Sequence, residues 1–152
     1  MDTLPTGVTG FYFYKNEPPP QMNLKQYKAV CYQIASLTGG LILRFVEAKE
    51  QKIRNYHTAI VKNQEVEYYI LCNAHYPLIG FSIQLDNGSF DFIDVGPVAE
   101  DFTSTGFTIL SAFFLNNSPS QGLYRALNTV ELKQINYWKP DKIGNIIFND
   151  WN

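Results

Sequence analysis

The chain has few of the residues that most often staple a fold or carry catalysis. Its 152 residues include two cysteines, Cys31 and Cys72, and two histidines, His57 and His75. Two cysteines do not form a disulfide framework, so the sequence indicates a reducing compartment, and we expect the cytoplasm. Only three arginines occur, which is a thin supply for the recognition of phosphate or nucleotides.

Long apolar runs and an export signal are also missing. No stretch approaches the roughly 20 apolar residues that span a membrane. The N-terminal segment MDTLPTGVTG has no basic region followed by an apolar one, so neither a membrane location nor a signal peptide is expected. Apolar residues make up 45% of the chain and charged residues 17%, which is typical of a folded protein. We expect a single domain over residues 1–152.

Basic residues are missing from the middle of the chain. No Lys or Arg occurs between Lys62 and Arg125. The acidic residues in this interval are Glu65, Glu67, Asp86, Asp91, Asp94, Glu100 and Asp101. If they share a face, they create a negative field that suits a basic partner and repels nucleic acid. The alternative is a solvated surface that keeps the protein soluble.

One helix is predicted clearly near the N-terminus. After the proline stop NEPPPQ, apolar residues recur at helical spacing from Leu24 to Leu37. Asn23 can cap the first turn, and Gly39 suits the left-handed position after the last one. We therefore predict a helix over Asn23–Thr38, with Cys31 on its buried side.

The central segments predict antiparallel strands. They are rich in β-branched and aromatic residues and are separated by turn residues. The predicted strands are Phe11–Tyr14, Leu41–Ala48, Tyr56–Val61, Val66–Cys72, Leu78–Leu85 and Ser89–Val95. A four-residue connection, KNQE, joins the third of these to the fourth, and Asp86-Asn87-Gly88 supplies the turn chemistry of the second hairpin.

The last third predicts helices and one strand. Pro97 and Ser118-Pro119 are placed to start helices, and Phe107–Leu115 follows helical spacing. An imperfect alternation from residue 130 to 137 suggests a strand. Ile143, Ile146, Ile147 and Trp151 share one helical face, but NIIFN also fits a short strand. In either case we expect the tail to be docked in the core. The fold class predicted is α+β: a mostly antiparallel sheet of five to seven strands, packed against the N-terminal helix and one or two later helices.

No catalytic or metal-binding pattern stands out. A Cys–His zinc site needs paired ligands at short spacing, and only Cys72 and His75 form such a pair. Asp91 and Asp94 are three residues apart, so on a strand they would face opposite sides and would not converge on a substrate. The common nucleotide-binding and hydrolase motifs are missing. We expect no enzyme activity, no metal and no cofactor.

The final segment supports a functional hypothesis. The pattern YWKP..IG.IIFN.W, from Tyr137 to Trp151, resembles the closing signature of small bacterial proteins that sit beside polymorphic or contact-dependent toxins. These resemble immunity proteins. The resemblance implies a non-enzymatic, cytoplasmic α/β or α+β protein that binds one toxin domain. It covers only this segment, and no binding residue carries over from it.

Taken together, these features predict an immunity protein that occludes a cognate toxin with a basic surface. The expected contact residues are the acidic ones, with Tyr68 or Tyr69 as aromatic anchors. Two alternatives stay open: a small-ligand-binding domain with an aromatic pocket, and a small hydrolase-like enzyme that uses His57 or His75 with a carboxylate.

Overall fold

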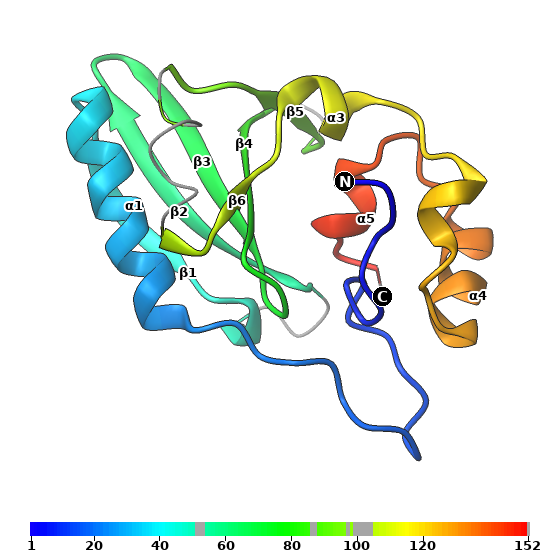
Figure 1. The fold of residues 1–152 in the computed structure, drawn as a ribbon. Helices are drawn as coiled ribbons and strands as arrows, with labels where there is room; N and C mark the ends of the chain where they lie inside the picture. The colour runs from blue at the N-terminus through cyan, green and yellow to red at the C-terminus, as the bar shows by residue number, and fades with distance from the viewer. Residues whose placement is uncertain (51–53, 86–87, 97, 99–104, 152) are drawn as a thin grey trace.

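A six-stranded sheet forms the centre of the protein (Figure 1). The computed structural model describes residues 1–50, 54–85, 88–96, 98 and 105–151. The strands are β1 (Leu41–Val46), β2 (Tyr56–Asn63), β3 (Val66–Asn73), β4 (Leu78–Gln84), β5 (Phe90–Ile93) and β6 (Thr108–Ile109). The helices are α1 (Leu24–Thr38), α3 (Ala112–Asn116), α4 (Thr129–Trp138) and α5 (Gly144–Ile147), with short 3₁₀ helices η1 (Ala48–Glu50) and η3 (Gln121–Tyr124). The predicted α+β class is confirmed.

The first five strands form an antiparallel meander, as predicted. Each of β1 to β5 pairs with the next strand in the chain. The short β6 pairs in parallel with the first residues of β4, on the edge whose other half is taken by β5. Asn63 pairs with Val66, so the β2–β3 turn contains only Gln64 and Glu65 and is tighter than the predicted four-residue connection. Gln64 takes the positive φ of 57° that such a turn requires.

Helix α1 covers one face of the sheet (Figure 1). The Asn23 side chain accepts a hydrogen bond from the backbone N–H of Gln26, and Gly39 ends the helix with a φ of 77°. Both caps were expected from the sequence. The buried side of the helix packs on the sheet residues that point toward it, and the core residues of this layer include Tyr27, Ile34, Ala59, Val61, Ile70 and Phe81.

The N-terminal segment and the later helices cover part of the other face. In Figure 1 this layer lies on the right, where both chain ends are found. Two glycines allow the close contact. A Cβ on Gly144 of α5 would lie 2.3 Å from the Phe92 ring, and a Cβ on Gly80 of β4 would lie 2.9 Å from the Phe148 ring. Any side chain at either position would push α5 away from the sheet.

Several predictions for the last third and the N-terminus were wrong. Phe11–Tyr14 is not a strand. The segment Phe107–Leu115 is split, because the Leu110 N–H bonds to the carbonyl of Ile79 beside β6, and α3 begins only after Ser111. Only the short η3 follows the predicted start at Ser118-Pro119. The predicted helix start at Pro97 lies outside the described residues.

Helix α4 replaces the strand predicted between residues 130 and 137. Its start is a capping box, in which the Asn128 side chain accepts from the Glu131 N–H and Glu131 accepts from the Asn128 N–H. Glu131 is fully buried and also accepts bonds from Gly7 N (2.8 Å), Thr9 N (3.0 Å) and Thr9 Oγ1 (2.6 Å). This buried carboxylate therefore has a full set of donors and ties the N-terminal segment to α4.

Three buried asparagines join both chain ends to the sheet. Asn55 precedes β2, Asn73 ends β3 and Asn149 follows α5. The side-chain amides of Asn55 and Asn73 both donate to the carbonyls of Val8 and Ile147, at distances of 2.7 to 3.1 Å. We call these three residues the asparagine network.

The third member of the network orients the tail. Asn149 donates its side-chain amide to the carbonyls of Thr9 and Ile146, and its side-chain oxygen accepts from the Trp151 N–H. Its backbone N–H donates to the Asn55 side-chain oxygen, and its carbonyl accepts from the Asn55 backbone N–H. The prediction that the tail is docked is confirmed, since Ile146, Ile147, Phe148 and Trp151 are all buried.

The network predicts a large cost for a single substitution. Asn149→Ala should lower the free energy of unfolding by about 2 to 4 kcal/mol, because it leaves buried backbone groups without partners. Asn145→Ala is the matched control, because the Asn145 side chain has no hydrogen-bond partner among the described residues. Urea unfolding should show a change below about 0.5 kcal/mol for the control. Equal stability of the two variants would contradict the role assigned to Asn149.

Candidate functional site

The acidic residues predicted as contacts that lie in the described part of the chain do not form one face. Glu65 lies in the β2–β3 turn and Glu67 on β3, and both are exposed. Asp91 lies on β5 opposite Ile83, which packs against the α1 layer, whereas Glu67 points to the other side of the sheet. Asp94 is exposed and accepts a hydrogen bond from the Ala112 N–H at 2.9 Å. Asp86, Glu100 and Asp101 lie outside the described residues.

The two tyrosines of the predicted site have different environments. Tyr68 is only 5% exposed, packs under α1 and has its hydroxyl 3.0 Å from that of Thr38. Tyr69 points to the opposite face, is half-buried and donates to the Gln84 side chain at 3.1 Å. Of the pair, only Tyr69 is placed to contact a partner.

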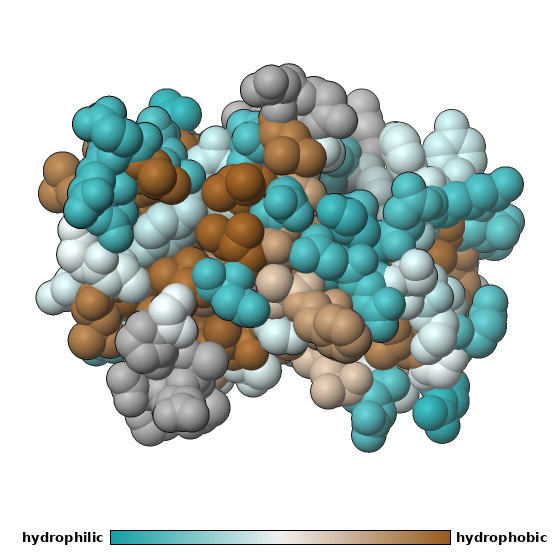
Figure 2. Space-filling view, turned by 90° about the horizontal axis from the view of Figure 1, so that it is seen from above, coloured by the Kyte–Doolittle hydropathy of each residue, from teal (hydrophilic) through white to brown (hydrophobic). Residues whose placement is uncertain are grey.

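A smaller acidic and apolar surface lies at one end of the sheet. The antiparallel pairing of Tyr69 with Ser82 brings the start of β3 and the end of β4 to the same end. Val66 and Leu85 are 61% and 43% exposed there and point to the same side of the sheet as Tyr68 and Ile83, toward α1. Glu65 lies in the adjoining turn, and Glu67 points to the opposite side of the sheet. We call Glu65, Val66, Glu67 and Leu85 the hairpin end. Figure 2 looks down on this end of the molecule, where hydrophobic and hydrophilic residues lie side by side.

The carboxylates of the hairpin end are not neutralised within the described part of the chain. Among the described residues, the only ion pairs join Glu47 to Lys28 and to Lys49, away from the hairpin end. Lys62 lies opposite Glu67 on the neighbouring strand but makes no ion pair with it. The negative charges of Glu65 and Glu67 therefore stay open to a partner.

The histidines are not arranged for catalysis. His57 faces α1, and its Nδ1 accepts from the Ala48 N–H at 2.9 Å. Burial lowers its pKa to about 4, so the ring is neutral at pH 7. His75 lies against the N-terminal segment, with Nδ1 2.9 Å from the Pro20 carbonyl, and burial lowers its pKa as well. Neither ring bonds to a carboxylate of the described residues.

The cysteines are equally unreactive by position. Both are buried and free, and burial raises the pKa of Cys31 to about 12 and that of Cys72 well above its usual value. Thiols with such pKa values are poor nucleophiles. Within the described ranges, no group of three or more His, Cys, Asp or Glu residues could hold a metal ion.

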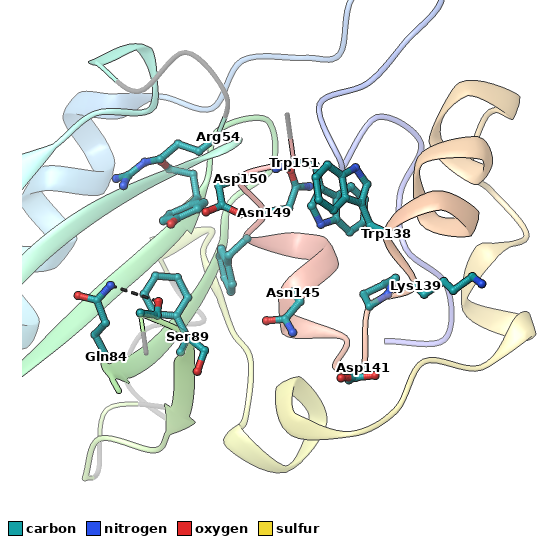
Figure 3. A pocket seen from close by; sticks show the side chains of 15 residues that line it. Arg54, Gln84, Ser89, Trp138, Lys139, Asp141, Asn145, Asn149, Asp150 and Trp151 are labelled. Carbon is teal, nitrogen blue, oxygen red and sulfur yellow. Dashed lines mark hydrogen bonds between the residues drawn. The ribbon is translucent and has the colours of Figure 1, made fainter. Parts of the chain in front are cut away.

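A groove of about 640 Å³ lies between the sheet and the C-terminal layer (Figure 3). It is called here the tryptophan groove. Its sheet side includes Arg54, Tyr56, Gln84 and Phe90, and its C-terminal side includes Trp138, Lys139, Asp141, Asn145, Asp150 and Trp151. Sequence reasoning missed this site. The signal available was the pair of tryptophans in the closing segment, which we interpreted as core.

The two tryptophans have different degrees of exposure. Their rings stack with centroids 6.3 Å apart and planes within 6°. Trp151 is 8% exposed and is backed by the Phe11 ring, while Trp138 is 38% exposed. The inner ring is therefore core, as predicted, and the outer ring belongs to the surface of the groove.

Comparisons with protein-family models, with curated proteins and with solved structures found no match to this chain. In the part of the chain that the structure describes, none of the helices has the length and apolar character needed to cross a membrane. The function must therefore be argued from the surfaces themselves.

The depressed pKa of His57 predicts a pH-dependent stability. The unfolded chain binds a proton at His57 near pH 6.5 and the folded chain only near pH 4, so the free energy of unfolding should fall as the pH drops through this window. His57→Gln should lose less stability than wild type between pH 7 and pH 5 in urea unfolding. Equal losses in the two proteins would show that His57 is not the linked group.

Proposed function

We propose that the protein is a non-enzymatic immunity protein that binds a basic toxin domain in the cytoplasm and occludes it. The observation that carries the proposal is the hairpin end, where Glu65 and Glu67 are exposed without an ion-pair partner among the described residues and the apolar Val66 and Leu85 are also exposed. The resemblance of the closing segment to immunity proteins points the same way.

The chemistry of this surface suits a basic protein partner. Opposite fields speed the encounter of two proteins, and apolar side chains that become buried in the contact then slow their separation. Asp91 lies near the start of β5, close to the same end of the sheet but on its α1 side, and it can extend the negative field. Asp94 contributes mainly to structure, through its bond to Ala112.

The enzymatic alternative has less support. A histidine that acts as a general base must be held by an orienting group and must reach the substrate. Burial lowers the pKa of both His57 and His75, and both rings bond to backbone groups. The ligand-binding alternative is favoured by a specific feature, the tryptophan groove, and is developed below.

The proposal predicts a salt-sensitive complex. A tagged pull-down from the native host, eluted with rising salt and identified by mass spectrometry, should yield one stoichiometric toxin domain with a basic surface. Recovery of no stoichiometric partner, or of a partner that resists high salt, would contradict the proposal.

Charge reversal at the hairpin end locates the contact. The double variant Glu65→Lys with Glu67→Lys should slow association with the captured toxin domain by about tenfold or more at low salt, and should reduce the salt dependence of the rate. Glu17→Lys is the matched control, because Glu17 is exposed in the N-terminal segment, far along the chain from β3. Surface plasmon resonance measures both rates. An unchanged association rate for the double variant would exclude the hairpin end as the contact.

A further inference from the structure

The tryptophan groove is a built feature that the proposed toxin contact does not use. The hairpin end is formed by the β2–β3 turn and the end of β4, whereas the groove lies between the sheet and the segment from Trp138 to Trp151. Its volume of about 640 Å³ is within the range of small-molecule sites. What it binds can be argued from its ring surface and from its polar groups.

The ring surface is a rigid aromatic platform. The Trp138 indole N–H donates to the Gln134 side chain at 3.0 Å, and the ring stacks on Trp151. Trp151 is held in turn by the bond from its backbone N–H to Asn149 and by the Phe11 ring behind it. A ring fixed in this way loses little conformational entropy when a ligand stacks against it.

The polar groups of the groove are balanced in charge and open to a ligand. Arg54 and Lys139 are matched by Asp141 and Asp150. The side chains of Lys139, Asp141, Asn145 and Asp150 form no hydrogen bond or ion pair within the described residues. Figure 3 shows Asp150 between Arg54 and the stacked tryptophans, and Asn145 between Asp141 and Ser89, which precedes β5. Donors and acceptors are thus both available around the platform.

Arg54 is the most fixed of the polar groups. Its guanidinium donates to the carbonyls of Val46 and Tyr56 and to the Thr58 hydroxyl, and it lies 4.3 Å from the centroid of the Tyr56 ring. No carboxylate of the described residues neutralises it. The positive charge of Arg54 lies at the margin of the sheet side, and in Figure 3 the guanidinium points away from Asp150 and the tryptophans.

The mixed charges of this lining disfavour fully apolar ligands and ligands that carry a net charge. A fully apolar ligand would desolvate Asp150 and Asn145 without giving them hydrogen bonds. A phosphate-bearing ligand would meet the carboxylates of Asp141 and Asp150, and a cationic peptide side chain would meet Arg54 and Lys139. The groove suits a ligand that is neutral, offers many donors and acceptors, and has a flat apolar face.

We infer that the tryptophan groove binds a saccharide, with one pyranose face on Trp138 and ring hydroxyls bonded to Asp150 and Asn145. The C–H face of a pyranose is apolar and flat, while its equatorial hydroxyls both donate and accept. A carboxylate accepts hydrogen bonds from two such hydroxyls, and a side-chain amide both accepts from them and donates to them. The inference does not depend on the proposed toxin contact.

Tryptophan fluorescence tests the inference directly, because the only two tryptophans in the chain both line the groove. The intact protein is titrated with maltose, cellobiose, lactose and N,N′-diacetylchitobiose. We expect a saturable change in emission with at least one of them, at a dissociation constant on the order of 1 mM. N-acetyl-arginine amide and AMP serve as cationic and phosphate-bearing probes, and should give no saturable change.

Three variants connect the signal to the site. Trp138→Ala should weaken binding of the responding sugar by about tenfold or more, and Asp150→Ala, at an exposed position, should weaken it by about fivefold. Phe113→Ala is the matched control, because Phe113 is an aromatic residue that is 82% exposed and does not line the groove, and the affinity of this variant should stay within about twofold of wild type. Isothermal titration calorimetry measures the affinities independently of the altered fluorescence.

The outcomes are decisive for the ligand class. No response to any of the four sugars overturns the inference, as does a sugar response that Trp138→Ala and Asp150→Ala leave unchanged. A saturable response to N-acetyl-arginine amide or AMP, with none to the sugars, assigns the groove to a charged ligand and also overturns it. The double variant Glu65→Lys with Glu67→Lys should bind the sugar as wild type does, so failure of the toxin proposal and failure of this inference are distinguishable.

Discussion

The asparagine network is the constraint on which the rest of the structure depends. Two carbonyls that would otherwise be buried without partners, those of Val8 and Ile147, each receive amides from both Asn55 and Asn73. An unpaired buried polar group costs about 1 to 3 kcal/mol, so these bonds are costly to break. Because the carbonyls belong to opposite ends of the sequence, satisfying them requires both chain ends to dock where β2 begins and β3 ends. Networks of this kind specify one arrangement of a core more sharply than apolar packing does.

The same network links the fold to the candidate ligand site. Asn149 lies between Phe148, which packs on Gly80 of the sheet, and Trp151, which supports the exposed Trp138 ring. The groove therefore forms because the tail is docked on the sheet. Its aromatic platform is rigid because Trp151, which stacks on Trp138, is buried in the core. The hairpin end lies at the far end of β3 from Asn73, on well-paired strands. The two candidate surfaces are thus positioned by different parts of the fold and can change independently.

Local patterns were enough to predict the helix over residues 24–38 and the five-stranded meander, because caps, turns and periodicity lie within a few residues of one another. Helix α4 was not predicted, because the alternation of residues 130 to 137 favours a strand. The spacing of Asn128 and Glu131, however, is that of a capping box, which indicates a helix start. The split of Phe107–Leu115 could not be predicted locally, because β6 forms only through pairing with Leu78 and Ile79. Pairing with a distant strand overrides helical spacing.

The candidate sites were predictable to different degrees. The acidic interval was evident from the sequence, and the expectation that Asp91 and Asp94 would not converge agrees with their separate environments. The sheet register, however, is needed to show that Glu67 and Asp91 point to opposite faces, and that Tyr68 is the buried tyrosine of its pair. The tryptophan groove combines Arg54, the end of β4 and the closing segment. No sequence pattern connects these positions, since strand pairing and the docking of the tail bring them together.

Native-state hydrogen exchange tests the central claim most directly, namely that both chain ends fold as one unit with the sheet. The amide hydrogens of Gly7, Thr9 and Asn149, which are bonded to Glu131 and Asn55, should be protected to within about tenfold of those of Ile70 and Leu71 in the centre of β3. Terminal amides that exchange at rates close to those of exposed loops, while β3 remains protected, would show that the ends open separately and would contradict this account.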